Sequence, residues 1–163
     1  KKAAAGYLDR VGELSPESKF SVIAYCNYPT VMCRNLAVSD NYDQILRSIE
    51  GIKSGGSTDI GNALEKAEPL FKEGCFKSGQ IVLLTDGMHN GAVDPVKVAR
   101  TLKKRSVRID CVGVGGDPRN VDEALMKRIA SRDQEGVPCY HYIKDGFELV
   151  KHFKSLAGYL SRE

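Results

Sequence analysis

The sequence predicts an α/β protein of three layers, with a doubly wound sheet that is mostly parallel and has one antiparallel edge strand. Strand-like and helix-like patterns alternate from one end of the 163-residue chain to the other. The stretch 80–85 (QIVLLT) is an unbroken apolar run, typical of a strand that helices cover on both faces. Near the start, the apolar stretches 19–26 and 31–38 flank a turn and predict a β-hairpin, which supplies the antiparallel edge.

Two helices are expected between this hairpin and the strand 80–85. Asn41 is expected to cap the first helix, which ends at Gly51. A glycine-rich loop, 55–58, leads into the second helix, which Pro69 is expected to interrupt. The apolar residues that fall at helical spacing are Tyr42, Ile45, Leu46 and Ile49 in the first helix, and Ile60, Ala63, Leu64 and Ala67 in the second.

The second half of the chain continues the alternation. Asp94-Pro95 begins a helix that ends in the basic residues 103–105, as the helix dipole favours. Strands are expected over 107–114 and 138–143, with a helix between them and another after them. The apolar positions of these two helices are Val121, Leu125 and Ile129, then Phe147, Val150, Phe153, Ala157 and Leu160.

Length and composition indicate one globular domain over residues 1–163. The chain is 42% hydrophobic and 28% charged, and its net charge of +3 is too small to argue for nucleic acid or an anionic membrane as partner. No apolar run approaches the length of a membrane span. The five cysteines form no C-x-x-C pair, which argues against a disulfide framework and a zinc site and favours the reducing cytoplasm. One bridge, between Cys26 and Cys33 around the hairpin turn, stays an alternative.

Polar loops at the strand ends are the candidate sites, since ligands of open parallel sheets bind beyond the carboxyl ends of the strands. A phosphate-binding loop at 55–61 is weakly supported, because the loop lacks the lysine of that motif and follows no strand. Ser57, Asp86 and His89 could form a catalytic group, yet no G-x-S-x-G elbow is present and His89 could be a solvated surface residue.

Metal binding is the third interpretation of these loops. The hydroxyl of Thr58 and the carboxylate of Asp86 suit a hard cation, Mg²⁺, Mn²⁺ or Ca²⁺. Each residue also has a purely structural interpretation: Ser57 or Thr58 could cap the following helix, and Asp86-Gly87 could form a tight turn.

The combination of these motifs resembles the von Willebrand factor type A domain family. The motifs are Gly55-Gly56-Ser57-Thr58 before a helix and an apolar strand that ends in Leu84-Thr85-Asp86-Gly87, with Asn90 beyond it. The likeness covers the whole chain, with 21–25, 31–38 and 109–115 similar to further strands of the family.

The resemblance implies a Rossmann-like fold and a binding module that is not an enzyme. It further implies a metal-ion-dependent adhesion site in which Thr58 and Asp86 are ligands of Mg²⁺, and in which one coordination position is left for an acidic group of a protein partner. The loop residues expected to contact that partner are Ser57, Asp59, Gly87, His89 and Asn90.

One part of the family pattern is not found in the sequence. The first metal motif, D-x-S-x-S, follows the first and central strand in this family, just before the helix that 2–11 resembles, and it occurs nowhere between Lys1 and Glu163. We therefore expect about 10–20 further residues ahead of Lys1, the length of an ordinary strand with its loop. Without that strand, the strands 21–25 and 81–85 would be left with a gap between them.

Three functions follow as hypotheses. The first is a metal-dependent protein-binding module; the second is a structural or regulatory domain of the same fold whose metal site is incomplete; the third is an enzyme that uses the same face. Fold alone does not name the partner, the pathway or the oligomeric state. Arg34, Arg108 and the basic residues 103–105 are interpreted as solvated faces. Asp117 is a weaker candidate near the site, and its expected role, with Gly115 and Gly116, is a turn.

Overall fold

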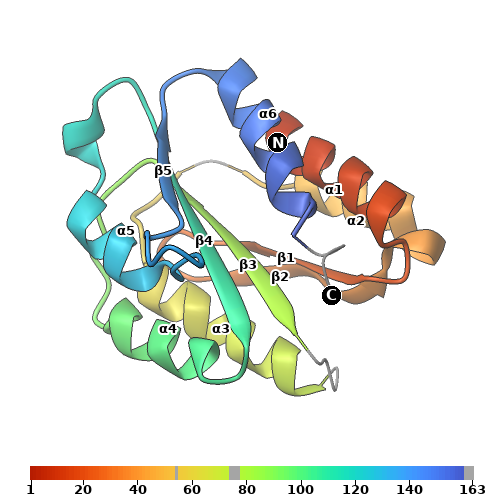
Figure 1. Cartoon of the computed structure of the whole chain (residues 1–163), viewed down its shortest axis with the longest axis horizontal. Helices are drawn as coiled ribbons and strands as arrows, with labels where there is room; N and C mark the ends of the chain where they lie inside the picture. The colour runs from red at the N-terminus through yellow and green to blue at the C-terminus, as the bar shows by residue number, and fades with distance from the viewer. Residues whose placement is uncertain (54, 74–77, 160–163) are drawn as a thin grey trace. The chain divides into compact units, whose positions relative to one another are not determined.

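The structure is a computed structural model that describes residues 1–53, 55–73 and 78–159. The chain divides into two compact units. The first consists of Lys1–Ala24, Thr30–Gly55 and the chain from Gly146 onward, and the second of Tyr25–Pro29 and Gly56–Asp145. Helices and strands alternate along the chain as predicted (Figure 1). Within the described residues, no helix is both long enough and apolar enough to cross a membrane. The single domain over 1–163 stays a prediction.

The first unit contains the hairpin and three helices. Strands β1 (Lys19–Ala24) and β2 (Thr30–Ala37) pair antiparallel, as predicted. Helix α1 (Lys2–Leu14) packs against α2 (Val38–Glu50) and α6 (Gly146–Ala157), and α2 packs on the hairpin. Tyr7 of α1 lies with its ring edge-on to Phe153 of α6, at 6.4 Å between ring centroids, so aromatic packing joins the two ends of this unit.

Helix α2 begins earlier than predicted. It starts at Val38 directly after β2, and Asn41 lies inside it with non-helical backbone angles (φ −130°, ψ 20°). The Asn41 side chain donates a hydrogen bond to the Ala37 carbonyl oxygen at 3.0 Å. Asn41 thus bonds backward into the helix start at a kink, and the expectation that it caps the helix is wrong.

The second unit is built on a parallel sheet, which confirms the α/β class. Its strands are β3 (Gly79–Thr85), β4 (Val107–Val114) and β5 (Tyr140–Ile143), in the order β3-β4-β5. The pairs Ile81 with Ile109 and Cys111 with Tyr140 set the register. The helices of this unit are α3 (Ile60–Glu73), α4 (Pro95–Lys103), the short 3₁₀ helix η1 (Pro118–Asn120) and α5 (Glu123–Ile129).

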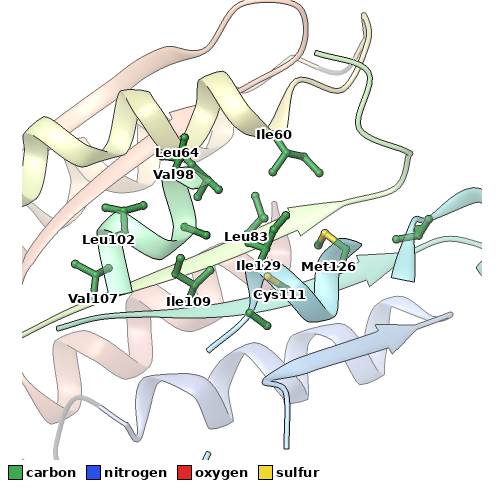
Figure 2. Packing of buried hydrophobic residues seen from close by; sticks show 13 residues of the cluster. Ile60, Leu64, Leu83, Val98, Leu102, Val107, Ile109, Cys111, Met126 and Ile129 are labelled. Carbon is green, nitrogen blue, oxygen red and sulfur yellow. The ribbon is translucent and has the colours of Figure 1, made fainter. Parts of the chain in front are cut away.

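One hydrophobic core holds this sheet to its helices. Figure 2 shows Ile60 and Leu64 of α3 and Met126 of α5 among side chains from the strands. Almost the whole of β4 is buried, whereas only Leu83 and Thr85 of β3 are fully buried. The central strand of this sheet is therefore β4, although the unbroken apolar run of β3 gave the stronger signal in the sequence.

Of three features predicted for the helices, the start of α4 is confirmed, and the predictions for Pro69 and Phe147 are wrong. Helix α4 starts at Asp94-Pro95 as predicted, and Asp94 caps it, with its carboxylate accepting hydrogen bonds from the Val96 and Lys97 amides. Pro69 does not interrupt α3, because burial of Leu70, the next residue, favours continuing the helix despite the lost hydrogen bond. Phe147 is 82% exposed, so it does not belong to the buried stripe of α6, and Leu160 lies outside the described residues.

The described strands form two sheets, β1-β2 in the first unit and β3-β4-β5 in the second. The strand expected ahead of Lys1, with its D-x-S-x-S motif, stays a prediction.

The described cysteines are free thiols, namely Cys26, Cys33, Cys111 and Cys139, and Cys75 lies outside the described residues. The alternative of a bridge between Cys26 and Cys33 is therefore not formed in this structure. Burial raises the pKa of the Cys33, Cys111 and Cys139 thiols. Raised pKa values keep these thiols protonated and unreactive at neutral pH, as expected of small core residues.

Candidate functional site

Three loops of the second unit meet around the start of α3. They are the segment 56–59 that leads into α3, the loop 86–94 that joins β3 to α4, and the turn 25–29. The loop 86–94 begins at the carboxyl end of β3, the position where open parallel sheets bind their ligands. All the residues predicted for the site lie in the first two of these loops.

Thr58 and Asn90 join the first two loops by reciprocal hydrogen bonds. The Thr58 amide donates to the Asn90 side-chain oxygen at 2.9 Å, and the Asn90 amide donates to the Thr58 carbonyl oxygen at 3.0 Å. The Thr58 hydroxyl also faces Gly87, where a Cβ would stand 3.0 Å from Oγ1. The structure therefore brings half-buried Thr58 against the loop that carries Asp86.

The turn at Asp86 is fixed by the residue before it. Thr85 is buried, and its Oγ1 both donates to the Gly87 carbonyl oxygen and accepts from the Gly87 amide, at 3.2 and 3.3 Å. This arrangement makes the tight turn that the sequence predicted as the structural alternative. It also leaves the Asp86 carboxylate exposed, so the turn presents the carboxylate rather than burying it.

Asp59 has a structural position at the start of α3. It is 6% exposed, and its two carboxylate oxygens accept hydrogen bonds from the backbone and side-chain amides of Asn62, at 3.0 and 2.6 Å. This is the bonding of a helix N-cap. Asp59 was expected to contact the partner, but it has no exposed group for this contact, because both carboxylate oxygens are hydrogen-bonded within the protein.

His89 supports the two loops from within. Its Nδ1 accepts from the Ile60 amide at 3.2 Å and, at 3.5 Å, from the Gly91 amide, while Nε2 lies 3.1 Å from the Val93 carbonyl oxygen. Two N–H donors on Nδ1 place the ring proton on Nε2, which donates to Val93. The interpretation of His89 as a solvated surface residue is wrong, because the ring is half-buried with both nitrogens bonded.

The turn 25–29 belongs to the same assembly, which the sequence did not indicate. Asn27 accepts from the Ser57 amide at 2.6 Å through its side-chain oxygen, and the Cys26 carbonyl oxygen accepts from the Asp59 amide at 3.1 Å. Gly56 has a φ of +86°, and a Cβ there would meet the Cys26 side chain at 2.9 Å. The only available signal was Asn27 itself, whose side chain commonly organises turns.

Tyr25 joins this turn to the end of β3. Its hydroxyl donates to the Leu84 carbonyl oxygen at 2.6 Å, and burial raises the pKa of the phenol. A raised pKa keeps the phenol protonated and able to donate. Tyr25 therefore holds the strand end from which the Asp86 turn begins.

Asp117 forms the turn expected of it after β4. Its carboxylate accepts from the Arg119 amide at 3.0 Å and pairs with the Arg119 guanidinium, which lowers the pKa of the carboxyl group. The nearby Gly115 carbonyl oxygen accepts a hydrogen bond from the Tyr142 hydroxyl at 2.5 Å. These contacts assign Asp117 to loop structure, as the sequence predicted.

The donor atoms at the site suit a hard cation. A threonine hydroxyl and an aspartate carboxylate offer oxygen ligands of the kind that Mg²⁺, Mn²⁺ and Ca²⁺ prefer. Among the described residues, no group of three or more histidine, cysteine, aspartate or glutamate side chains could hold a metal ion. Thr58 and Asp86 supply two oxygen donors, which fit such an ion only as part of a larger ligand set.

Comparisons with solved structures place the fold among von Willebrand factor type A domains. The domain from Catenulispora acidiphila matches at a TM-score of 0.79 with 20% identity, over 98% of this chain and 37% of that one. Proximal thread matrix protein 1 from the mussel byssus, in a structure described as having a zinc-occupied MIDAS motif, matches at 0.73 with 22% identity, over 98% and 40%. The SpRpn10 VWA domain matches at 0.68 with 15% identity, over 93% and 78%.

The chain spans about two fifths of the length of the first two of these structures. Comparison with curated proteins finds no match. The family model of the von Willebrand factor type A domain matches residues 1–155, nearly the whole chain. The sequence match and the α/β topology thus agree, and the chain belongs to the von Willebrand factor type A domain family.

Proposed function

We propose that this chain is a protein-binding module, without catalytic activity, that engages an acidic side chain of its partner through a divalent cation. Thr58 and Asp86 would hold the cation, with water and further ligands completing its coordination. Mg²⁺ is the first candidate, and Mn²⁺ and Ca²⁺ are the alternatives. When bound, the cation supplies a localised positive charge and an open position that accepts one carboxylate oxygen.

The pairing of Thr58 with the loop that carries Asp86 is the main support for this proposal. The reciprocal hydrogen bonds between Thr58 and Asn90 hold the two loops together through the Thr58 backbone and the Asn90 amide and side-chain oxygen, which leaves the Thr58 hydroxyl free of that task. The bonds of His89 to the Ile60 amide and the Val93 carbonyl oxygen add a second connection. A ligand set held by a fixed scaffold pays little ordering cost when the ion binds.

The exposed residues around these two ligands would form the contact surface for the partner. Ser57 and Asn90 are exposed, and the backbone of Gly87 is half-buried beside the Thr58 hydroxyl. His89 contributes as support for the loops rather than as a contact. Free thiols in the described part of the chain agree with the reducing cytoplasm as the proposed location.

Calorimetric titration with MgCl₂ tests the proposal. The protein should be produced from its complete reading frame. We expect Thr58→Ala and Asp86→Ala each to weaken Mg²⁺ binding at least about tenfold, the scale on which even outer contacts of metal sites act. The matched controls Thr101→Ala and Glu135→Gln, at exposed positions away from the site, should bind Mg²⁺ like the parent.

The result also separates the proposal from its alternatives. No Mg²⁺, Mn²⁺ or Ca²⁺ binding by a correctly folded full-length protein would contradict the metal-dependent function and favour a domain that binds by another surface. Catalytic turnover that depends on His89 would favour an enzyme. Unchanged Mg²⁺ affinity in both Thr58→Ala and Asp86→Ala would show that the ligands lie elsewhere.

A further inference from the structure

Two large apolar side chains are exposed on the loops of the candidate site. Tyr28, in the turn 25–29, is 83% exposed, and Met88, two residues after Asp86, is 54% exposed. A single exposed apolar side chain needs no explanation. Here, however, each one belongs to a loop that is hydrogen-bonded to the segment 57–60, and both loops lie in the second unit.

The positions of these side chains are set by the scaffold of the site. Tyr28 follows Asn27, which accepts from the Ser57 amide at 2.6 Å. Met88 lies between Gly87, where an added Cβ would stand 3.0 Å from Thr58 Oγ1, and His89, which accepts a hydrogen bond from the Ile60 amide. The hydrogen bonds that join these loops to the segment 57–60 therefore also hold two apolar side chains in water, where they gain nothing for folding.

We propose that Tyr28 and Met88 form an apolar rim of the cation site, and that the partner is a protein segment in which a glutamate or aspartate is flanked by large apolar side chains. This inference rests on the proposed function, because the cation supplies the contact with the carboxylate. The partner would then be recognised by two features: a negative charge that complements the cation, and apolar side chains beside it that bury the rim.

The cation and the apolar rim would contribute differently to binding. A cation recognises any carboxylate, so it fixes orientation but discriminates poorly among acidic partners. Tyrosine offers a large rigid contact surface at low entropic cost and is frequent among the residues that dominate binding. Methionine is flexible and polarisable, and it adapts to apolar side chains of different shape. The rim would therefore decide which acidic segments bind.

Two peptide pools test this inference on the full-length protein. Every peptide in both pools has one fixed glutamate, and the outer positions are random. In the apolar-flanked pool, the two residues beside the glutamate are mixtures of Leu, Phe and Tyr. In the polar-flanked pool, they are mixtures of Ser, Asn and Gly. Retention on the immobilised protein is measured in MgCl₂ and in EDTA. We expect the apolar-flanked pool to be retained at least about fivefold more than the polar-flanked pool in MgCl₂, and this excess to disappear in EDTA.

Variants of the rim make the test specific. The double variant Tyr28→Ser, Met88→Ser should lose the preference for apolar flanks while its Mg²⁺ affinity, measured by calorimetry, stays that of the parent. Val137→Ser is the matched control, since Val137 is 53% exposed on a different loop of the same unit, and it should keep the preference.

Failure of this inference differs from failure of the proposed function. Mg²⁺ binding with equal retention of both pools would overturn the inference alone, as would a double variant that keeps the preference. Retention of the apolar pool that is equal in EDTA and MgCl₂ would also overturn it, because charge and apolar flanks would then not be read together. Absence of Mg²⁺ binding would contradict the proposed function, and the inference with it.

Discussion

Thr58 and Asn90 exchange hydrogen bonds at the centre of the candidate site, with the Thr58 amide 2.9 Å from the Asn90 side-chain oxygen and the Asn90 amide 3.0 Å from the Thr58 carbonyl oxygen. The two residues are 32 positions apart, on loops that precede α3 and follow β3. The pair therefore holds Thr58 against the loop 86–94, which carries Asp86, the other residue proposed as a metal ligand, although Asn90 itself need not touch the ion.

Asn90→Ala should lower both stability and cation affinity. It removes the acceptor of the Thr58 amide, so we expect a loss of about 0.5–1.5 kcal/mol in the free energy of unfolding, the usual net value of one hydrogen bond. Looser loops should also weaken Mg²⁺ binding, by about tenfold, as for outer contacts of other metal sites. Urea unfolding and calorimetric titration measure the two effects.

Asn90→Asp is the matched control for this substitution, because a carboxylate oxygen can replace the amide oxygen as acceptor. It should retain most of the stability that Asn90→Ala loses. An alanine variant with parental stability and parental Mg²⁺ affinity would show that the pair does not position the site.

Gly91→Ala should destabilise the second unit, because there is no room for a methyl group. A Cβ on Gly91 would stand 2.1 Å from Oδ1 of Asp59, the buried carboxylate that caps α3. Relief of this clash would displace either the cap or the loop, at a cost of about 1–3 kcal/mol. Thermal unfolding followed by circular dichroism measures the loss.

Gly116→Ala serves as control for the glycine substitution, since nothing lies within 4 Å of a Cβ there. Its effect should stay within about 0.5 kcal/mol, as at other open surface positions. Equal stability of the two variants would mean that the loop 86–94 moves freely away from Asp59, contrary to the close packing of Gly91 against the Asp59 carboxylate.

Much of the fold could be predicted from the sequence because its helices and strands carry strong local signals. The strand 107–114 was predicted with its observed bounds, and Asp94-Pro95 marked the start of α4. Boundaries were wrong where a local signal competed with packing. Asn41 is a common helix-capping residue but lies within α2. Pro69 disfavours a helix, but α3 continues past it because the next residue, Leu70, is buried.

The site was only partly predictable, for a different reason. Thr58 and Asp86 stand out because their residue types and motifs are local in the sequence. The contacts that position them are not local: Asn27 is 30 residues from Ser57, and His89 is 29 from Ile60. Such pairings depend on which loops meet in space, and a single sequence contains no signal for them beyond the turn chemistry of each loop.

Lys103 is a half-buried residue whose ammonium group stabilises the end of a neighbouring helix. The sequence predicts a solvated charge at the end of α4, but Lys103 Nζ donates to the carbonyl oxygens of Arg128, Ile129 and Ala130, at 3.3, 3.0 and 3.1 Å. It thereby caps the carboxyl end of α5, where a positive charge is favoured. Burial lowers the pKa of its ammonium group, as this half-buried position requires.

Lys103→Met should therefore destabilise the protein, whereas Lys104→Met, at the exposed next position, should not. Methionine keeps much of the apolar stem but leaves three carbonyl groups without this donor, so we expect a loss of about 1–3 kcal/mol. Urea unfolding of both variants measures it. Equal stability of the two would mean that water replaces the ammonium group at no cost.

Arg108 is likewise no solvated charge, since it donates to the buried Asp110 carboxylate at 2.7–3.0 Å. Gln80 donates to the same carboxylate at 2.7 Å. Removal of one partner of a buried ion pair leaves an uncompensated charge, which typically costs about 3–5 kcal/mol. We expect Arg108→Met to lose stability on this scale and Arg34→Met, at an exposed position, to lose far less, with urea unfolding as the measurement.

The contribution of Tyr140 to the free energy of unfolding is expected to depend on pH. Its hydroxyl is buried against Gly113, where no hydrogen-bond partner is found among the described residues, and burial, with the charge of Glu123 adding to it, raises the pKa of the phenol to about 12. An unfolded tyrosine has a pKa of about 10. Between pH 10 and 12 the unfolded chain therefore loses this proton first, so that stability present below pH 10 declines as the pH rises.

Tyr140→Phe should remove this part of the alkaline loss of stability. The parent and the variant should differ progressively above pH 10, in favour of the variant, and the difference should level off above pH 12. At pH 7 the variant should be as stable as the parent or more so, because it removes a buried hydroxyl without breaking a hydrogen bond. Unfolding curves at pH 7, 9, 10 and 11 measure both effects, and parallel pH profiles for the two proteins would contradict the raised pKa of Tyr140.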